Sequence, residues 1–240
     1  MIRLTPDATN GHGHYKDSTP EGGCEFGHYA PELTCMIITD KIALRLLEKR
    51  EWLTPEEGLK KAEVHGFLTE ALSSIKELKK RLSNRSDIEE HQAALFVGGL
   101  KSRAPCFTWE YSPGELGEIN READCFCRVN IDGQYYYKPL QLKEVVAGER
   151  RGNSLQDVIN GLAGKYAAQA GQENLVVAIR VSRAMTIDFA KLTIPAELRI
   201  QQLWLFGLTG PRVGFIVGDL LGDNPEQTDF PLPEFHFRRS

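Results

Sequence analysis

The dipeptide Asp132-Gly133 constrains this chain most strongly, because it separates two runs with the composition of β-strands. A two-residue type I′ turn needs positive φ at both central residues, and Asp-Gly is one of the dipeptides that best adopt it. Residues 125–131 (CFCRVNI) and 134–145 (QYYYKPLQLKEV) are rich in aromatic and branched side chains. We therefore predict a β-hairpin with a two-residue loop, whose register follows from the turn.

The predicted register places Asp124 opposite Gln141 in a non-hydrogen-bonded pair, where side chains of neighbouring strands come closest. Because side chains alternate along a strand, Asp124, Gln141 and Lys143 share one face, which we expect to be polar and exposed to solvent. A carboxylate and an amide carbonyl at this separation can bind one hard cation. The opposite face is predicted to belong to the core, and it carries Cys125, Cys127, Val129, Ile131, Leu140 and Leu142.

Helical periodicity precedes the hairpin. Apolar residues at spacings of three and four predict helical structure over about 39–82. Within this stretch, Thr54-Pro55 provides an N-cap and a proline at the first helical position. A capping-box spacing then predicts a third helix over about 87–97, ending near Gly98-Gly99.

After residue 105 the pattern changes to that of strands, with one more helix predicted over 153–170. We expect an α/β fold in which a mixed central sheet of about five or six strands is flanked by helices. Besides the hairpin, strands are predicted at 106–111, 175–181, 202–208 and 213–220. The chain divides into an irregular arm (1–38), a helical N-terminal segment (39–85), an α/β domain (86–221) and an irregular C-terminal tail (222–240).

The bulk composition does not identify a partner. The chain has 29 Lys and Arg against 33 Asp and Glu, a net charge of −4, so nucleic-acid binding would need a local basic patch. No apolar run approaches the roughly 18 residues of a membrane-spanning helix, and the first residues do not resemble a signal peptide. We therefore expect a cytoplasmic protein without a membrane partner.

The five cysteines are scattered and form no CxxC pair, so neither a disulfide framework nor an ordinary zinc site is expected. Cys125 and Cys127 lie on the predicted core face, where buried, unreactive thiols are the simplest interpretation. The histidines and cysteines of the N-terminal arm also lack the spacing of zinc ligands; they are His12, His14, Cys24, His28 and Cys35.

Residues 122–145, EADCFCRVNIDGQYYYKPLQLKEV, resemble the core hairpin of the PD-(D/E)XK, or restriction-endonuclease-like, phosphodiesterases. Asp124 stands at the place of the motif aspartate, and Gln141-Leu142-Lys143 stands at the place of the (D/E)-x-K motif. The predicted order of elements is also similar: a helix that carries an acid, the hairpin, a second helix and further strands. Gln141 departs from the pattern, because it replaces the second acid and removes one negative charge from the cation site.

This resemblance implies hydrolysis of a phosphodiester with Mg²⁺ or Mn²⁺ as the cofactor, and it favours DNA over RNA as the substrate. Asp124 and Gln141 would hold the cation. Lys143 would orient the attacking water and neutralise charge on the phosphorus. One acid of the preceding helix would complete the site, and we favour Glu90 over Glu89, because other positions mark a different side of that helix as inward-facing.

Several residues could supply local positive charge for nucleic acid: Arg128, Lys138, Arg150, Arg151 and Lys165. Lys165 is followed by Tyr166, which we expect to pack at the end of its helix. Two other interpretations stay open. The chain could be a catalytically degenerate module that keeps the nuclease fold and binds nucleic acid or protein, or an α/β interaction protein in which the resemblance of the hairpin is accidental. In the simplest interpretation of the hairpin, its polar side is a solvent-exposed sheet surface on which Glu122 and Lys143 form an ion pair. A homodimer is compatible with each.

Overall fold

The protein is described here by a computed structural model. The described residues are 3–4, 41–64, 85–114, 122–145, 154–167, 173–182, 186–210, 212–222 and 225–234. The predicted hairpin is confirmed: β3 (Cys125–Ile131) and β4 (Gln134–Val145) pair antiparallel from Ile131↔Gln134 to Cys125↔Leu140. The turn residues Asp132 and Gly133 have φ values of 51° and 85°, as a type I′ turn requires.

The hairpin belongs to a seven-stranded mixed sheet with the order β2-β3-β4-β5-β7-β8-β9. The further strands are β2 (Thr108–Pro113), β5 (Val176–Val181), β7 (Gln202–Gly210), β8 (Val213–Val217) and β9 (Gln227–Pro231). β4, β5 and β7 run parallel to one another, and the remaining neighbours are antiparallel. A second, two-stranded parallel pair joins β1 (Arg3–Leu4) to β6 (Thr186–Ile187). The fold is therefore α/β with a mixed sheet, as the sequence predicts.

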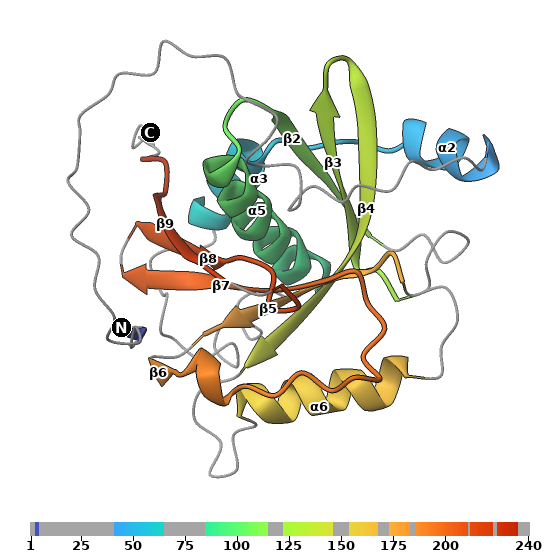
Figure 1. Ribbon diagram of the computed structural model, residues 1–240. Helices are drawn as coiled ribbons and strands as arrows, with labels where there is room; N and C mark the ends of the chain where they lie inside the picture. Colours follow the sequence, from blue (N-terminus) through green and yellow to red (C-terminus); the bar gives the residue numbers. More distant parts are fainter. Residues whose placement is uncertain are drawn as a thin grey trace.

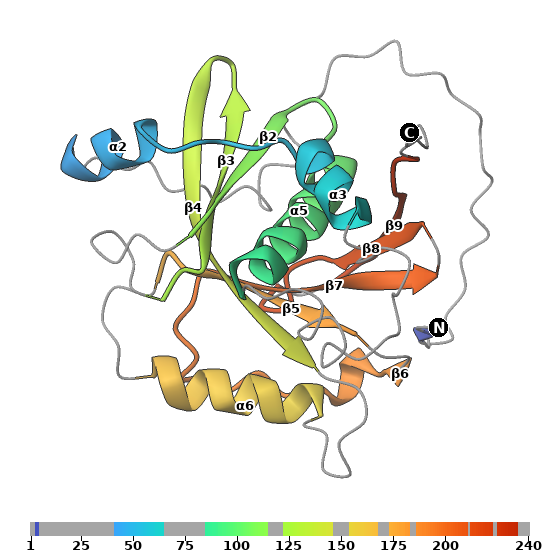
Figure 2. The same cartoon turned by 180° about the vertical axis from the view of Figure 1, so that it is seen from behind.

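Helices cover both faces of the sheet (Figures 1 and 2). α5 (Arg85–Arg103) and α3 (Pro55–Val64) lie on one face, and α6 (Leu155–Tyr166) lies on the other. α2 (Lys41–Glu48) lies beside the hairpin, and a single 3-10 turn, η1 (Phe189–Lys191), follows β6. No described helix is long and apolar enough to cross a membrane.

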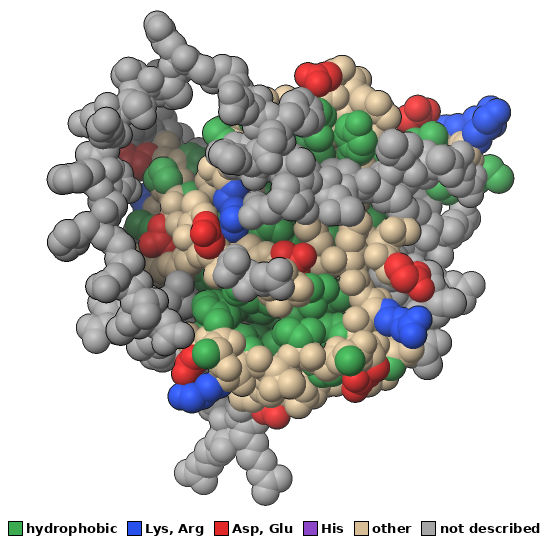
Figure 3. All heavy atoms as spheres, in the orientation of Figure 1, with side chains coloured by type: hydrophobic (Ala, Val, Ile, Leu, Met, Phe, Trp, Pro, Cys, Tyr) green, Lys and Arg blue, Asp and Glu red, His purple; other side chains and the backbone are tan. Residues whose placement is uncertain are grey.

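Each face has its own hydrophobic core. The core under α5 contains Phe96 together with Cys125, Leu142 and Trp204 from the sheet. The core under α6 contains residues of α6, of the sheet and of α2: Ile159, Leu162, Phe126, Val177, Leu205, Ala43 and Leu47. The space-filling view in Figure 3 shows part of this hydrophobic interior in a hollow above α6.

The capping predictions hold for α3. The Thr54 hydroxyl accepts a hydrogen bond from the Glu57 N–H at 3.3 Å, and the Glu57 carboxylate accepts one from the Thr54 N–H at 2.8 Å. Leu53, just before this cap, exchanges two backbone hydrogen bonds with Tyr111 of β2, at 2.8 and 2.9 Å. The described part of the predicted N-terminal segment therefore shares the core of the sheet; residues 65–84 lie outside the described chain.

α5 is longer than predicted and passes through Gly98-Gly99 to end at Arg103. A Cβ atom at Gly99 would lie 3.0 Å from Ile216 Cβ and 3.1 Å from the Phe230 ring. The absent side chain allows β8 and β9 to approach the helix closely. Glycine therefore serves packing at this position and does not end the helix.

The tail from residue 222, predicted to be irregular, contains β9. Phe230 and Leu232 are 4% exposed and belong to the core under α5. Because β9 is an edge strand, Pro231 is tolerated there. Two buried apolar residues among prolines and polar residues give too weak a pattern for a strand prediction.

Candidate functional site

Asp124 lies one residue before β3, and its carboxylate is fixed against β4. Its Oδ2 accepts a hydrogen bond from the Leu142 N–H at 2.7 Å, and its own N–H donates to the Leu140 carbonyl at 3.0 Å. The regular ladder stops at Cys125↔Leu140, so the predicted direct pairing of Asp124 with Gln141 is not part of it. The contact is made by the side chain instead. Because Leu142 N is bonded to the carbonyl carbon of Gln141, the Asp124 carboxylate lies against the Gln141 backbone.

Gln141 points to the α6 face of the sheet. It is the cross-strand partner of Val177, which belongs to the core under α6. The residue is only 4% exposed, and its Oε1 has no hydrogen-bond partner in the described part of the chain. A buried acceptor without a donor costs about 1–3 kcal/mol. The side-chain oxygen of Gln141 is therefore unsatisfied among the described residues, and Gln141 directly precedes Leu142, whose N–H binds Asp124.

Lys143 follows on the same face, two residues along β4, and is the cross-strand partner of Ile179. It is partly exposed, whereas Asp124 is 8% exposed. As predicted, Glu144 points to the opposite face, where its carboxylate lies 3.9 Å from the fully buried Arg180. Burial lowers the pKa of Arg180 to about 10, and the Glu144 charge opposes this shift. Asp124, Gln141 and Lys143 thus belong to one side of β3 and β4, as the alternation requires.

This side is not the exposed polar surface that the sequence predicts. α6 and α2 cover it, and Phe126 and Tyr137 on the same face are buried. The signal was present in the sequence, because these two aromatic residues have the same alternation as Asp124 and Gln141. The polar groups are therefore buried in a mainly apolar layer.

Three further residues, one of them the predicted cation Lys165, lie beside this site. Lys165, at the end of α6, forms an ion pair with Glu122, and its Nζ lies 5.1 Å from the centroid of the Tyr166 ring. Tyr166 is fully buried, and its hydroxyl has no hydrogen-bond partner within the described chain. Burial raises the pKa of Tyr166 above its ordinary value, and the charges of Glu122 and Asp124 raise it further.

Glu90, the predicted third ligand, does not join this site. It belongs to α5, on the opposite face of the sheet, and its Oε1 accepts a hydrogen bond from Lys61 Nζ at 2.9 Å. With Arg50 and Lys61 it lines a separate pocket of about 290 Å³. Glu89, the alternative, lies near Cys125: burial raises the pKa of that thiol first, and Glu89 is among the charges that raise it further.

Carboxylates do not cluster enough to hold a metal by themselves. Among the residues that the structure describes, no group of three or more His, Cys, Asp or Glu side chains has such an arrangement. Cys125 and Cys127 are buried, reduced thiols, as predicted. A cation at Asp124 would therefore need the amide oxygen of Gln141 and further oxygen ligands.

Two of the cations that were predicted to bind phosphate make contacts within the fold instead. Arg128 Nε donates to Glu110 at 2.7 Å, and its guanidinium lies between two rings, 4.3 Å from that of Trp52 and 4.1 Å from that of Tyr135. Arg150 and Arg151 lie outside the described residues. Lys165 is the predicted cation that the structure places beside the site.

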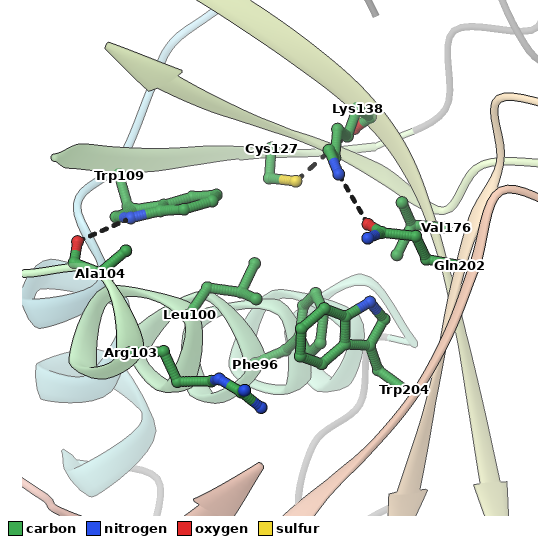
Figure 4. Close-up of a pocket in the computed structure, with 10 residues that line it drawn as sticks. All are labelled: Phe96, Leu100, Arg103, Ala104, Trp109, Cys127, Lys138, Val176, Gln202 and Trp204. Carbon is green, nitrogen blue, oxygen red and sulfur yellow. Dashed lines mark hydrogen bonds between the residues drawn. The ribbon is translucent and has the colours of Figure 1, made fainter. Parts of the chain in front are cut away.

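Lys138 is the second of these cations, and its side chain points away from Asp124 into the core under α5. It is 4% exposed, and its Nζ donates to Gln202 Oε1 at 2.6 Å (Figure 4). Apolar walls from Phe96, Trp109 and Trp204 surround this pair. The alternation that places Leu140 in the core places Lys138 there as well. We therefore exclude Lys138 from the phosphate-binding surface.

Comparisons of the chain with protein-family models, with curated proteins and with solved structures give no match.

Proposed function

We propose that this chain is a metal-dependent nuclease that hydrolyses phosphodiester bonds, with DNA as the favoured substrate and Mg²⁺ or Mn²⁺ as the cofactor. The observation that carries the proposal is the buried pair of Asp124, fixed by the Leu142 N–H, and Gln141, whose Oε1 is unsatisfied among the described residues. Mg²⁺ prefers oxygen ligands, so one carboxylate and one amide oxygen fit part of its coordination shell, and water and phosphate oxygens would supply the rest.

The topology supports the same proposal. A helix that carries acids (α5) precedes three antiparallel strands (β2, β3 and β4), and α6 then leads to the parallel strand β5. This arrangement agrees with the core expected from the resemblance to PD-(D/E)XK phosphodiesterases. The aspartate lies at the start of the middle strand, and the Gln-x-Lys sequence lies in the third.

Each residue has a role that follows from its position. A bound divalent cation would polarise a phosphate oxygen and make a coordinated water more acidic. Asp124 and Gln141 would supply ligand oxygens, and the Leu142 N–H keeps the carboxylate oriented. Lys143 would place a positive charge beside the phosphate and stabilise the negative charge that develops on its oxygens. Burial of the pair strengthens these interactions, because little water screens them.

Cleavage of plasmid and of short duplex and single-stranded oligonucleotides, with Mg²⁺ or Mn²⁺, tests the proposal. We expect metal-dependent products, and a loss of at least about 100-fold in rate for Asp124→Asn and for Lys143→Met. Lys191→Met is the matched control, because Lys191 is an exposed lysine that pairs with Asp188, three residues before it. Cleavage that survives both site substitutions, with the proteins folded, would refute the assignment.

A second candidate is a catalytically degenerate module with the same fold. The replacement of an acid by Gln141 and the lack of a three-acid cluster among the described residues favour it. This candidate predicts nucleic-acid binding without cleavage, unchanged by chelation of divalent metal and by Asp124→Asn. The same set of proteins therefore separates the two functions.

A further inference from the structure

Glu122 and Lys165 form an ion pair at the edge of the candidate site. Glu122 lies two residues before Asp124 in the chain, and Lys165 lies at the end of α6, which covers Gln141 and Asp124. The ammonium group of Lys165 also approaches the Tyr166 ring, 5.1 Å from its centroid. The pair therefore connects the start of β3 to the helix that closes this side of the sheet.

The surroundings of this pair lack hydrogen-bond partners for two buried oxygens. Within the described chain, Gln141 Oε1 and the Tyr166 hydroxyl have none, and these residues are 4% and 0% exposed. Burial raises the pKa of Tyr166, and the charges of Glu122 and Asp124 raise it further. The two unsatisfied oxygens thus lie on the α6 face of the sheet, and Lys165 of α6 holds the Glu122 carboxylate.

The pair is also weak enough to exchange. The Lys165 and Glu122 side chains are 39% and 21% exposed, and ion pairs with this exposure contribute little to stability. A carboxylate interacts more strongly with a divalent cation than with an ammonium group at the same distance, because the charge is doubled. A divalent cation can therefore compete with the Lys165 ammonium group for the Glu122 carboxylate.

We propose that Glu122 is the third oxygen ligand of the cation site and that Lys165 competes with the cation for its carboxylate. This inference rests on the proposed function, because it presumes that Asp124 and Gln141 bind a divalent cation. Glu122 restores the negative charge that Gln141 removes from the site. Lys165 holds this carboxylate at the edge of the site and releases it as the cation binds.

Direct binding of Mn²⁺ to the full chain, followed by the electron paramagnetic resonance signal of free Mn²⁺, tests the inference without any measurement of cleavage. Glu122→Gln removes a ligand charge, so we expect about tenfold weaker binding. Lys165→Met removes the competitor, so we expect binding about two- to fivefold tighter. Glu56→Gln and Lys101→Met are the controls, because they break an ion pair between α3 and α5 whose lysine is as exposed as Lys165, 40% against 39%.

The double variant Glu122→Gln/Lys165→Met distinguishes competition from a general effect of charge. If Lys165 acts by holding Glu122, then Lys165→Met has no effect on Mn²⁺ affinity once Glu122 is replaced. If the affinity rises equally in both backgrounds, Lys165 acts through its field alone and the exchange is refuted.

The remaining outcomes separate this inference from the proposed function. Mn²⁺ binding that is lost in Asp124→Asn and unchanged in Glu122→Gln retains the cation site and refutes Glu122 as a ligand. Weaker Mn²⁺ binding in both Glu122→Gln and Lys165→Met refutes the competition, because it shows that the ion pair only supports the fold. Absence of Mn²⁺ binding to the unaltered chain refutes the cation site and this inference together.

Discussion

The substitution Gln141→Glu places a second carboxylate in a buried position against Asp124 and should destabilise the metal-free protein. Gln141 is 4% exposed and Asp124 is 8% exposed, so water screens their repulsion only weakly. Two unit charges about 4 Å apart repel by about 4 kcal/mol at an effective dielectric constant of 20. Protonating one of them at pH 7 instead costs about 3–4 kcal/mol, because the ordinary pKa of Glu is about 4.3. We expect the free energy of unfolding to fall by about 3–4 kcal/mol at pH 7.

The pH dependence of this loss follows from the direction of the shift. Repulsion raises the pKa of the carboxylate pair in the folded variant above its value in the unfolded chain. The variant is therefore closest to the parent in stability below the ordinary pKa of Glu, and it loses stability as the pH rises through the raised pKa. Excess Mg²⁺ should reverse the loss at pH 7, because a bound cation compensates the second charge.

Urea unfolding at pH 5 and pH 7, with and without excess Mg²⁺, measures these changes. Gln134→Glu is the control, because it adds the same charge at an exposed position in the hairpin and should change stability by less than about 0.5 kcal/mol. If Gln141→Glu is as stable as the parent at pH 7 and does not respond to Mg²⁺, the side chains of residues 124 and 141 do not converge.

Four further substitutions test the packing, the burial and the surface of the fold. Gly58→Ala should destabilise the protein by about 1–3 kcal/mol, because the new Cβ would lie 1.9 Å from the Tyr111 hydroxyl. Gly161→Ala should stabilise it by about 0.5–1 kcal/mol, because a Cβ at this position of α6 would meet nothing within 4 Å. Thermal unfolding of the two variants measures both changes. Burial raises the pKa of Tyr166, so the contribution of its neutral hydroxyl to stability is complete below pH 10 and is lost above it. Tyr166→Phe should therefore reduce the decrease of the unfolding free energy above pH 10 by up to about 1.4 kcal/mol per pH unit, as measured by urea unfolding. An unchanged decrease would contradict the burial of Tyr166. Lys138→Met should leave the affinity for DNA unchanged in a fluorescence-anisotropy titration, because the ammonium is buried under α5, and a loss of affinity without unfolding would contradict this placement.

The hairpin was predictable because local chemistry decides it. The Asp132-Gly133 turn and the alternating residues around it specify β3 and β4 without help from distant parts of the chain. The same alternation identifies the residues that accompany Leu140 and Leu142 into the core, and Lys138 is one of them. The prediction that Lys138 contacts phosphate was based on its charge, whereas its position in the strand places it in the core.

Other features depend on contacts that a local pattern does not contain. The close approach of Ile216 to Gly99 explains why α5 continues where the sequence predicts an end. The partner of Glu90, Lys61, comes from α3, so the use of this acid for an ion pair depends on how two helices pack. Likewise, the ion pair between Glu122 and Lys165 joins residues 43 positions apart in sequence. The polar residues of the hairpin and the helix α6 were predictable, but the position of α6 over these residues was not.

The direct test of the cation site is the response of the Gln141 side-chain amide to Mn²⁺ in the nuclear magnetic resonance spectrum of the ¹⁵N-labelled chain, with Gln141→Leu used for assignment. Paramagnetic broadening decreases steeply with distance, so only amides close to the bound ion lose their signal at low Mn²⁺ concentration. Gln202 is the internal reference, because it is equally buried and bonded to Lys138 in the core under α5. We predict that the Gln141 amide signal disappears while the Gln202 signal persists. Persistence of both signals, or their loss together, would contradict a cation site at Asp124 and Gln141.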